Sequence, residues 1–305
     1  MISAHPSMSD WFASIFPGRV QKIAVNAGLG CPNRDGTIGT HGCIYCNNIA
    51  FNPAYAHNSM GSISEQLEDG ATFFKRKGEP YGYLPYFQSY SNTYGETGKL
   101  ISLYEEALRF PKVVGLVIAT RPDCLKEDLL DYFERRFGRL APEGHPFLLV
   151  ELGIESTCDA TLRAIGRGHD FACAQEAVRK LSQRGIHVGA HLILGLPGEN
   201  IEDWKMHARR ISELPLSTLK LHQLQVVKGT MLAKQYIRDP ESVTLFTPEG
   251  YMRAIAAFLK ELRPGIVIDR LVSETPRELL LAPAWGLKPN EFAKMLEDYL
   301  QQMAI

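Results

Sequence analysis

The chain has 305 residues, of which 45% are hydrophobic and 22% charged, and this composition is typical of a globular protein and excludes intrinsic disorder. Its 33 Lys and Arg residues nearly balance 34 Asp and Glu residues, so the net charge of −1 supplies no overall positive field to attract DNA, RNA or an anionic membrane. Any RNA contact must therefore come from a local patch. No apolar run is long enough to span a bilayer, and the start MISAHPSMSDWFASIF lacks the order of a signal peptide, so we expect a cytoplasmic protein with no membrane or DNA partner.

Apolar, β-branched runs of strand length alternate with amphipathic stretches along most of the chain. The predicted strands cover residues 20–26, 83–90, 113–120, 147–153, 187–194 and 218–225. Residues 171–184 illustrate the helices, because Phe171, Ala174, Val178 and Leu181 recur at helical spacing before Gly185. Repeated strand–helix units favour an α/β fold with a parallel sheet, as an open or partial barrel.

Polar residues follow the ends of the predicted strands. They are Asn26, residues 88–93, Thr120, Arg121, Glu151, Glu155, Ser156, His191, residues 195–199 and residues 222–225. Ligands of parallel α/β proteins bind at the carboxyl ends of the strands, so we expect these residues to meet at one rim. The alternative is that they are ordinary polar loop residues.

The segment after Lys228 has a different pattern, with predicted helices over 247–262 and 290–303 and a short predicted strand in GIVIDRL. We divide the chain into an N-terminal segment (1–19), a core barrel (20–245) that contains a cysteine loop (28–48), and a C-terminal helical extension packed on the barrel (246–305).

Three of the six cysteines fall in one glycine-rich loop, where Cys31, Cys43 and Cys46 have the spacing C-x11-C-x2-C. Three thiolates of this kind can hold three irons of a [4Fe–4S] cluster and leave the fourth iron open to a ligand. Two alternatives remain: a zinc site completed by His41, and thiols without a metal. The other cysteines, at 124, 158 and 173, are scattered and are interpreted as packing residues, with a second cluster as the alternative.

The loop sequence CPNRDGTIGTHGCIYCN resembles the radical S-adenosylmethionine (SAM) superfamily, specifically its Elp3/coproporphyrinogen-dehydrogenase-like branch and a bacterial subfamily with the signature CPNRDGTxGxxGCxYCN. TRPDCL, ELGIES, RGH, HLILGLPGE and KGT follow in the family order, and the resemblance covers about residues 20–285. It implies a partial (β/α)6 barrel of the radical SAM type with a short C-terminal extension. It also implies that Cys31, Cys43 and Cys46 hold a [4Fe–4S] cluster whose open iron binds SAM.

By position in the family, SAM would be bound by Tyr45, Gln88, Asn92, Thr93, Glu155, Arg167 and His191. Two departures are visible, since residues 88–93 lack the family's glycines and Ala119 stands where relatives have a carboxylate. The alternative for Arg167 is a surface ion pair, for Tyr45 packing over the cluster, and for His191 a satisfied core histidine. No catalytic residue is assigned.

The resemblance implies reductive cleavage of SAM to methionine and a 5′-deoxyadenosyl radical, with an electron from a flavodoxin- or ferredoxin-type reductant. We expect a tRNA base, the wobble uridine side chain, as the substrate. His222, Gln223, Gln225, Lys228 and Arg270 would line the entrance, and basic groups at 75–77, 135–139 and 209–210 are candidate phosphate contacts or solvated surface. About sixty residues follow the barrel strands, so acetyl transfer is not expected. The alternatives are a radical SAM enzyme acting on a small metabolite such as a porphyrin precursor, and a non-enzymatic iron–sulfur or zinc protein.

Overall fold

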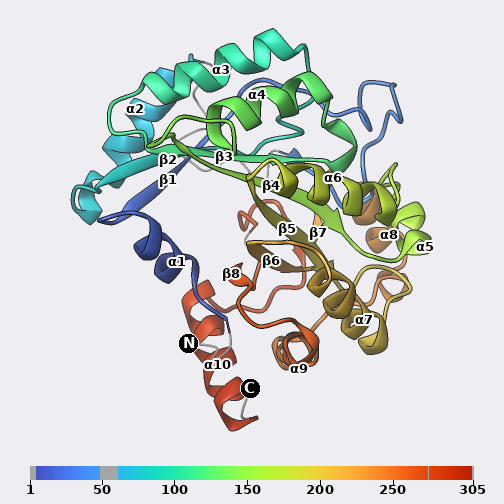
Figure 1. The fold of residues 1–305 in the computed structure, drawn as a ribbon. Helices are drawn as coiled ribbons and strands as arrows, with labels where there is room; N and C mark the ends of the chain where they lie inside the picture. The colour runs from blue at the N-terminus through green and yellow to red at the C-terminus, as the bar shows by residue number, and fades with distance from the viewer. Residues whose placement is uncertain (1–4, 49–60, 274, 304–305) are drawn as a thin grey trace.

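Seven parallel strands form one curled sheet in the computed structural model, which describes residues 5–48, 61–273 and 275–303 (Figure 1). In sheet order, which is also chain order, they are β1 (Val20–Val25), β2 (Gly82–Phe87), β3 (Gly115–Thr120), β4 (Phe147–Glu155), β5 (His187–Leu194), β6 (Thr218–Gln223) and β8 (Val267–Arg270). All six predicted barrel strands are confirmed. The seventh strand, β8, comes from the predicted GIVIDRL strand, so the last part of the chain contributes to the sheet.

Helices in the connections cover the outer face of the sheet, and in Figure 1 α2, α3 and α4 lie together on that side of β1 to β4. The long helices are α2 (Ile63–Phe74), α3 (Thr97–Arg109), α4 (Glu127–Phe137), α6 (Phe171–Gln183), α7 (Ile201–Ser212), α9 (Pro248–Glu261) and α10 (Pro289–Gln302). The predicted helices at 171–184, 247–262 and 290–303 are confirmed as α6, α9 and α10. Their starts follow local capping chemistry: the Asp170 side chain accepts the Cys173 N–H at the start of α6, and Thr247 caps α9.

Shorter elements complete the connections. They are α1 (Met8–Ile15), η3 (Lys75–Lys77), η4 (Pro122–Cys124), α5 (Asp159–Ala164), α8 (Met231–Arg238), η5 (Pro240–Ser242) and a small antiparallel pair, β7 (Val226–Val227) with β9 (Leu280–Ala282). None of the helices in the described ranges is long and apolar enough to cross a membrane.

Side chains alternate between the two faces of the curled sheet. Leu116, Ile118 and Val150 belong to the large outer core that the helices bury. The inner face has a separate, smaller apolar cluster, in which Leu84 and Leu149 pack around Phe12 of α1. Figure 1 accordingly shows α1 on the side of the sheet opposite to α2, α3 and α4. Helix α1 therefore fills the amino-terminal end of the barrel interior and leaves the carboxyl end for a site.

The edge of β8 is paired with the segment that precedes α1. The Ile268 N–H donates to the Pro6 carbonyl at 2.9 Å, and the His5 ring lies 3.1 Å from the Ile266 carbonyl. Backbone groups of an edge strand need such partners. The first described residues of the chain thus close one side of the barrel and anchor α1 inside it.

Candidate functional site

The cysteine loop leaves the end of β1 and is folded on itself by its own backbone. The Arg34 N–H donates to the Cys31 carbonyl at 2.8 Å, and the Cys46 N–H donates to the Cys43 carbonyl at 3.0 Å. Cys43 is buried, whereas Cys31 and Cys46 are half-buried. The turn between Cys43 and Cys46 places the two thiols close together, as a C-x2-C spacing requires of a shared site.

One glycine of this loop allows a close approach that another residue would block. Gly42 has φ +73°, and a Cβ on it would lie 2.9 Å from the Arg34 guanidinium. That guanidinium donates to the Cys46 carbonyl at 2.6 Å. The Gly42 N–H donates to the Asn33 carbonyl at 2.7 Å. Arg34 therefore ties the two ends of the loop together across Gly42.

Two N–H donors from outside the cysteine pair point at the Cys43 sulfur. The Asn33 amide lies 3.5 Å from it and the Arg167 guanidinium 3.7 Å. Both are distances at which sulfur accepts a hydrogen bond and a thiolate is stabilised. The same Asn33 amide also donates to the carbonyls of Gly166 and Arg167, at 2.7 and 3.1 Å. The RGH segment is thereby fastened to the cysteine loop.

Arg167 is 7% exposed, so the structure rejects the alternative of a surface ion pair. Its Nη2 donates to the Gly153 carbonyl at 2.5 Å and lies 3.4 Å from the Glu155 carboxylate. Its Nε donates to His169 at 3.0 Å, and its own carbonyl accepts from Arg121 at 2.7 Å. Burial would lower the pKa of Arg167, but Tyr45, Glu155 and Cys43 raise it, so the guanidinium stays charged.

Glu155 ends β4 in an unusual backbone conformation. Its φ is +68°, and the pairing of β4 with β5 shifts register between Gly153 and Glu155. A Cβ on Gly153 would lie 2.6 Å from both the Arg167 guanidinium and the Glu155 carboxylate. Burial, followed by the charges of Glu155 and Cys43, raises the pKa of Tyr45. The structure thus brings Tyr45, Glu155 and Arg167 together beside Cys43.

The segment after β2 uses two of its predicted SAM-binding side chains for its own structure. Asn92 is fully buried, and its amide donates to the carbonyls of Phe87 and Ala119 at 3.0 and 2.9 Å. Thr93 is also fully buried and lies 2.7 Å from both the Thr120 hydroxyl and the Cys124 carbonyl. Gln88 is half-buried at the end of β2. The Asn92 amide nitrogen and the Thr93 hydroxyl therefore bond to the ends of β2 and β3 and to the segment after β3. The neighbouring Ser91 N–H joins this segment to the cysteine loop through the Gly30 carbonyl at 3.2 Å.

A network of charged side chains fills the barrel interior between α1 and the strand ends. Glu151 of β4 lies 2.6 Å from the Lys220 amine of β6, 2.7 Å from the Tyr86 hydroxyl and 3.0 Å from His191 Nε2. Asp269 of β8 lies 3.2 Å from Lys220 and 2.8 Å from Lys22 of β1. Glu151 is 1% exposed. Two lysines and two carboxylates thus compensate one another where unpaired charges would be very costly.

Because the ionised Glu151 carboxylate only accepts, His191 donates to it through Nε2, and its Nδ1 remains for another partner. The His222 ring lies 5.9 Å from the His191 ring, with His222 Nδ1 2.6 Å from the Ser273 hydroxyl. Burial, then the charge of His191, lowers the pKa of His222 well below its ordinary value. His191 is therefore both a satisfied histidine and the member of the network nearest the strand ends.

The other predicted entrance residues fall into two groups. Gln223 bonds the backbone of Ser273 and Gln225 bonds the Thr275 hydroxyl, so both join β6 to the segment after β8. Arg270 is exposed at the end of β8. The Lys228 carbonyl instead accepts from Asn47, which places this residue beside the cysteine loop.

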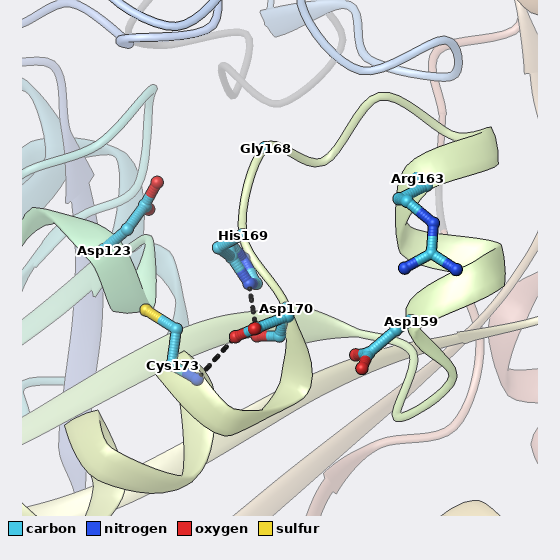
Figure 2. A pocket seen from close by; sticks show the side chains of 7 residues that line it. All are labelled: Asp123, Asp159, Arg163, Gly168, His169, Asp170 and Cys173. Atoms are coloured by element: carbon cyan, nitrogen blue, oxygen red, sulfur yellow. Dashed lines mark hydrogen bonds between the residues drawn. The ribbon is translucent and has the colours of Figure 1, made fainter.

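A pocket of about 570 Å³ lies behind the RGH segment and contains mixed charges (Figure 2). Its lining includes Asp123, Asp159, Arg163, His169 and Asp170. The carboxylates already have structural tasks: Asp123 pairs with Arg121, Asp159 accepts from Phe171 and Asp170 caps α6. Burial and the charge of Arg167 lower the pKa of His169 to about 4, so His169 is a neutral acceptor for Arg167.

Sequence reasoning missed Lys22, Lys220, Asp269 and Tyr86 as members of the interior network. A signal was present, because Lys220 stands between two leucines in TLKL, and Lys22 and Asp269 each adjoin an isoleucine in the short runs QKIAV and VIDR. A charge at an inward position of a parallel strand needs a partner.

The cysteine loop has the donor set of an iron–sulfur site. No three His, Cys, Asp or Glu side chains in the described ranges are close enough to hold a single metal ion. In a [4Fe–4S] cluster each thiolate binds a different iron. Burial, then the charge of Cys43, raises the pKa of Cys46 to about 11, so the Cys46 thiol needs added positive charge to become a thiolate. The loop residues therefore fit a cluster.

The interior network predicts a specific dependence of stability on pH. Burial would raise the pKa of Glu151, but Lys220 and Lys22 lower it well below 4.5. A lowered pKa contributes stability above the unfolded-state value, and this stability is lost as the pH falls toward the folded-state value. Glu151→Gln should reduce the free energy of unfolding by about 3 kcal/mol at pH 7, because it leaves lysine charge uncompensated.

The decrease in stability below pH 4.5 should also be shallower in Glu151→Gln than in the unmodified chain, as measured by urea unfolding. Glu202→Gln is the control, because Glu202 is 69% exposed, and it should change stability by less than about 0.5 kcal/mol. If stability falls equally steeply below pH 4.5 in Glu151→Gln and in the unmodified chain, Glu151 is not held ionised by its lysines.

Comparison with known proteins identifies the family. The radical SAM superfamily model matches residues 28–211, and the radical SAM C-terminal domain model matches residues 216–302. The chain is 37% identical over 280 residues to Protein YhcC of Escherichia coli (strain K12), which covers 92% of this chain and 86% of that protein.

Two more distant relatives share parts of the chain or its fold. The tRNA uridine(34) acetyltransferase of Dehalococcoides mccartyi (strain CBDB1) is 32% identical over 184 residues, which are 59% of this chain and 37% of that enzyme. The structure of Methanocaldococcus infernus Elp3 has a TM-score of 0.68 at 18% identity and covers 93% of this chain and 63% of that one. It therefore shares the fold. The family model and the identity to YhcC show that the chain is an enzyme of the radical SAM superfamily.

Proposed function

We propose that this radical SAM enzyme modifies a uridine of tRNA, at the wobble position. The observation that supports the substrate is the 32% identity over 184 residues to an enzyme named tRNA uridine(34) acetyltransferase. The matched part is 37% of that enzyme, so we transfer the uridine substrate and not acetyl transfer. An anticodon loop presents unpaired bases, which a recessed site at strand ends can reach at low cost.

Cys31, Cys43 and Cys46 would hold the [4Fe–4S] cluster, for which the Arg34 and Arg167 guanidinium groups add positive charge beside the sulfurs. When bound, the cluster and SAM supply one-electron cleavage of the sulfonium and a 5′-deoxyadenosyl radical that abstracts hydrogen. A flavodoxin- or ferredoxin-type protein would deliver the electron. The chain's own residues hold the cysteine loop over the strand ends and limit the access of water.

Among the predicted SAM-binding residues, Glu155, Arg167 and Tyr45 are those that the structure places beside Cys43. His191 lies opposite Gly153 in the β4–β5 register, one strand away from this group. We propose that these four residues contact SAM, with Glu155 and Arg167 facing its charged groups and Nδ1 of His191 accepting or donating a hydrogen bond. Gln88, on the neighbouring strand end, is the fifth candidate.

The cysteine assignment predicts where iron is lost. Anaerobic reconstitution should give about four irons per chain, and replacing Cys31, Cys43 or Cys46 with Ala should abolish the cluster absorbance. Cys158→Ala and Cys173→Ala are matched controls that should retain it. One zinc per anaerobically purified chain, bound by three sulfurs and a nitrogen, would contradict the assignment.

The substrate assignment predicts stimulation by RNA. Anaerobic enzyme, SAM and a chemical reductant should produce 5′-deoxyadenosine faster when tRNA from a strain lacking this protein is added, and the stimulation should fall with rising salt. Nucleoside analysis of the same tRNA should show conversion of a uridine at the wobble position.

Two controls distinguish a tRNA substrate from a small metabolite. Mature tRNA from a strain that contains the protein should stimulate less, because its uridine is already modified. A small-molecule extract with all RNA digested should not stimulate. Equal stimulation by that extract would reject tRNA as the substrate in favour of a small metabolite.

A further inference from the structure

A second pocket lies between the cysteine loop and the start of α8 and has a basic lining. Its volume is about 410 Å³, and Arg34, His41, Asn47 and Lys234 are among the residues that line it together with Cys43 and Cys46. No acidic side chain of the described residues lines it. Lys234 and Arg238, one turn apart on α8, are both exposed. The pocket therefore presents positive charge directly beside the proposed cluster ligands.

Two hydrogen bonds join the cysteine loop to the segment that leads into α8, on the two sides of this pocket. The Leu232 N–H at the start of α8 donates to the Ile44 carbonyl at 2.8 Å. The Asn47 amide donates to the Lys228 carbonyl at 2.7 Å. The cysteine loop and α8 are thus hydrogen-bonded together, and a molecule held by Lys234 lies next to the cysteine loop.

An exposed aromatic residue, Tyr90, stands near Arg34 of this pocket. Tyr90 is 40% exposed, although its φ of +65° is a conformation that aromatic residues rarely adopt. Its N–H donates to the Asn48 side chain at 3.2 Å, which ties it to the cysteine loop. Burial would lower the pKa of Arg34, but Cys46 and the nearby Tyr90 hydroxyl raise it. A ring held in this way is available for stacking.

Several of the basic groups first considered as phosphate contacts are paired or lie away from the site, and Arg210 donates to the Thr157 carbonyl at 2.5 Å. Arg136 pairs with Glu105, Arg139 with Glu134 and Arg209 with Glu261. Lys75 lies in η3, which leads into the amino end of β2, whereas the site is at the carboxyl ends of the strands. The pocket beside the cysteine loop is therefore the better candidate for anion binding at the site.

We propose that this basic pocket, together with Tyr90, is an RNA-binding surface in which Lys234, Arg238 and His41 contact phosphates and Tyr90 stacks on an unpaired base. This inference rests on the proposed tRNA substrate and adds the surface that binds it. Basic residues beside an exposed aromatic ring are the usual means of holding single-stranded RNA. A concave, polar pocket also fits a phosphate better than the broad face of an acidic electron carrier, which is the competing occupant.

Binding of unmodified tRNA by the full chain, measured at several salt concentrations, tests the surface without depending on turnover. Lys234→Glu combined with Arg238→Glu should weaken tRNA binding at least tenfold. It should also reduce the slope of log binding constant against log salt concentration by the amount expected for the loss of about two phosphate contacts. Tyr90→Ala should weaken binding about tenfold with the salt dependence unchanged, and Tyr90→Phe should restore it, because stacking needs only the ring. Lys260→Glu, an exposed residue of α9, is the charge control and should bind as the unmodified chain does.

Three results would overturn the inference, and they can be told apart. If tRNA stimulates the unmodified enzyme but the Lys234/Arg238 variant keeps its affinity and salt dependence, only the surface is wrong. If the variant binds tRNA normally but is reduced more slowly by flavodoxin or ferredoxin, the pocket serves the electron carrier. If the unmodified chain neither binds tRNA nor is stimulated by it, the surface and the proposed substrate fail together.

Discussion

The contacts of one buried guanidinium organise the site. The Arg167 guanidinium contacts the Cys43 sulfur, the Gly153 carbonyl at the end of β4 and the Glu155 carboxylate. It also donates to His169, and the backbone carbonyl of Arg167 accepts from Arg121. Because a buried charge with several donors is stable only if each finds a partner, these groups must stay in place together. The position of the cysteine loop over the strand ends follows from this arrangement.

The barrel interior supports the site in layers. Aromatic residues of α1 fill the amino-terminal end, and above them Glu151, Lys220, Lys22 and Asp269 form the charged network. Gly189 leaves space beside Glu151, since a Cβ there would lie 3.3 Å from the Glu151 Cγ and 2.4 Å from the Thr218 hydroxyl. Through Lys22 and Asp269 the network also links the first and last strands of the open sheet, and through His191 it reaches the proposed SAM-binding residues. The same network therefore closes the barrel and fixes the orientation of His191.

Much of the fold could be predicted from local sequence pattern. Five of the six barrel strands are apolar runs with β-branched residues, and β2 is an apolar, aromatic run. Because the strands are parallel, their polar end residues lie at the same rim. The cysteine loop was visible from spacing and glycine content. The interior network was not, because Lys22 and Asp269 meet across 247 positions of the chain and only when the sheet curls. Residues 88–93 show a second limit, since whether Asn92 binds a ligand or its own backbone depends on the end of β3, which no local pattern describes.

Amide hydrogen exchange of the metal-free chain tests most directly whether Arg167 positions the cysteine loop. The Ile44 N–H donates to the Ile165 carbonyl at 3.0 Å, so its amide reports on the contact between the loop and the segment that leads into Arg167. The Gly42 N–H donates to the Asn33 carbonyl, so its amide reports on the fold of the loop itself. In Arg167→Ala these amides should exchange about tenfold faster or more, while amides of β4 and β5 keep their protection. Unchanged exchange at Ile44 and Gly42 in a folded Arg167→Ala chain would show that the loop is held without the guanidinium and would contradict the account.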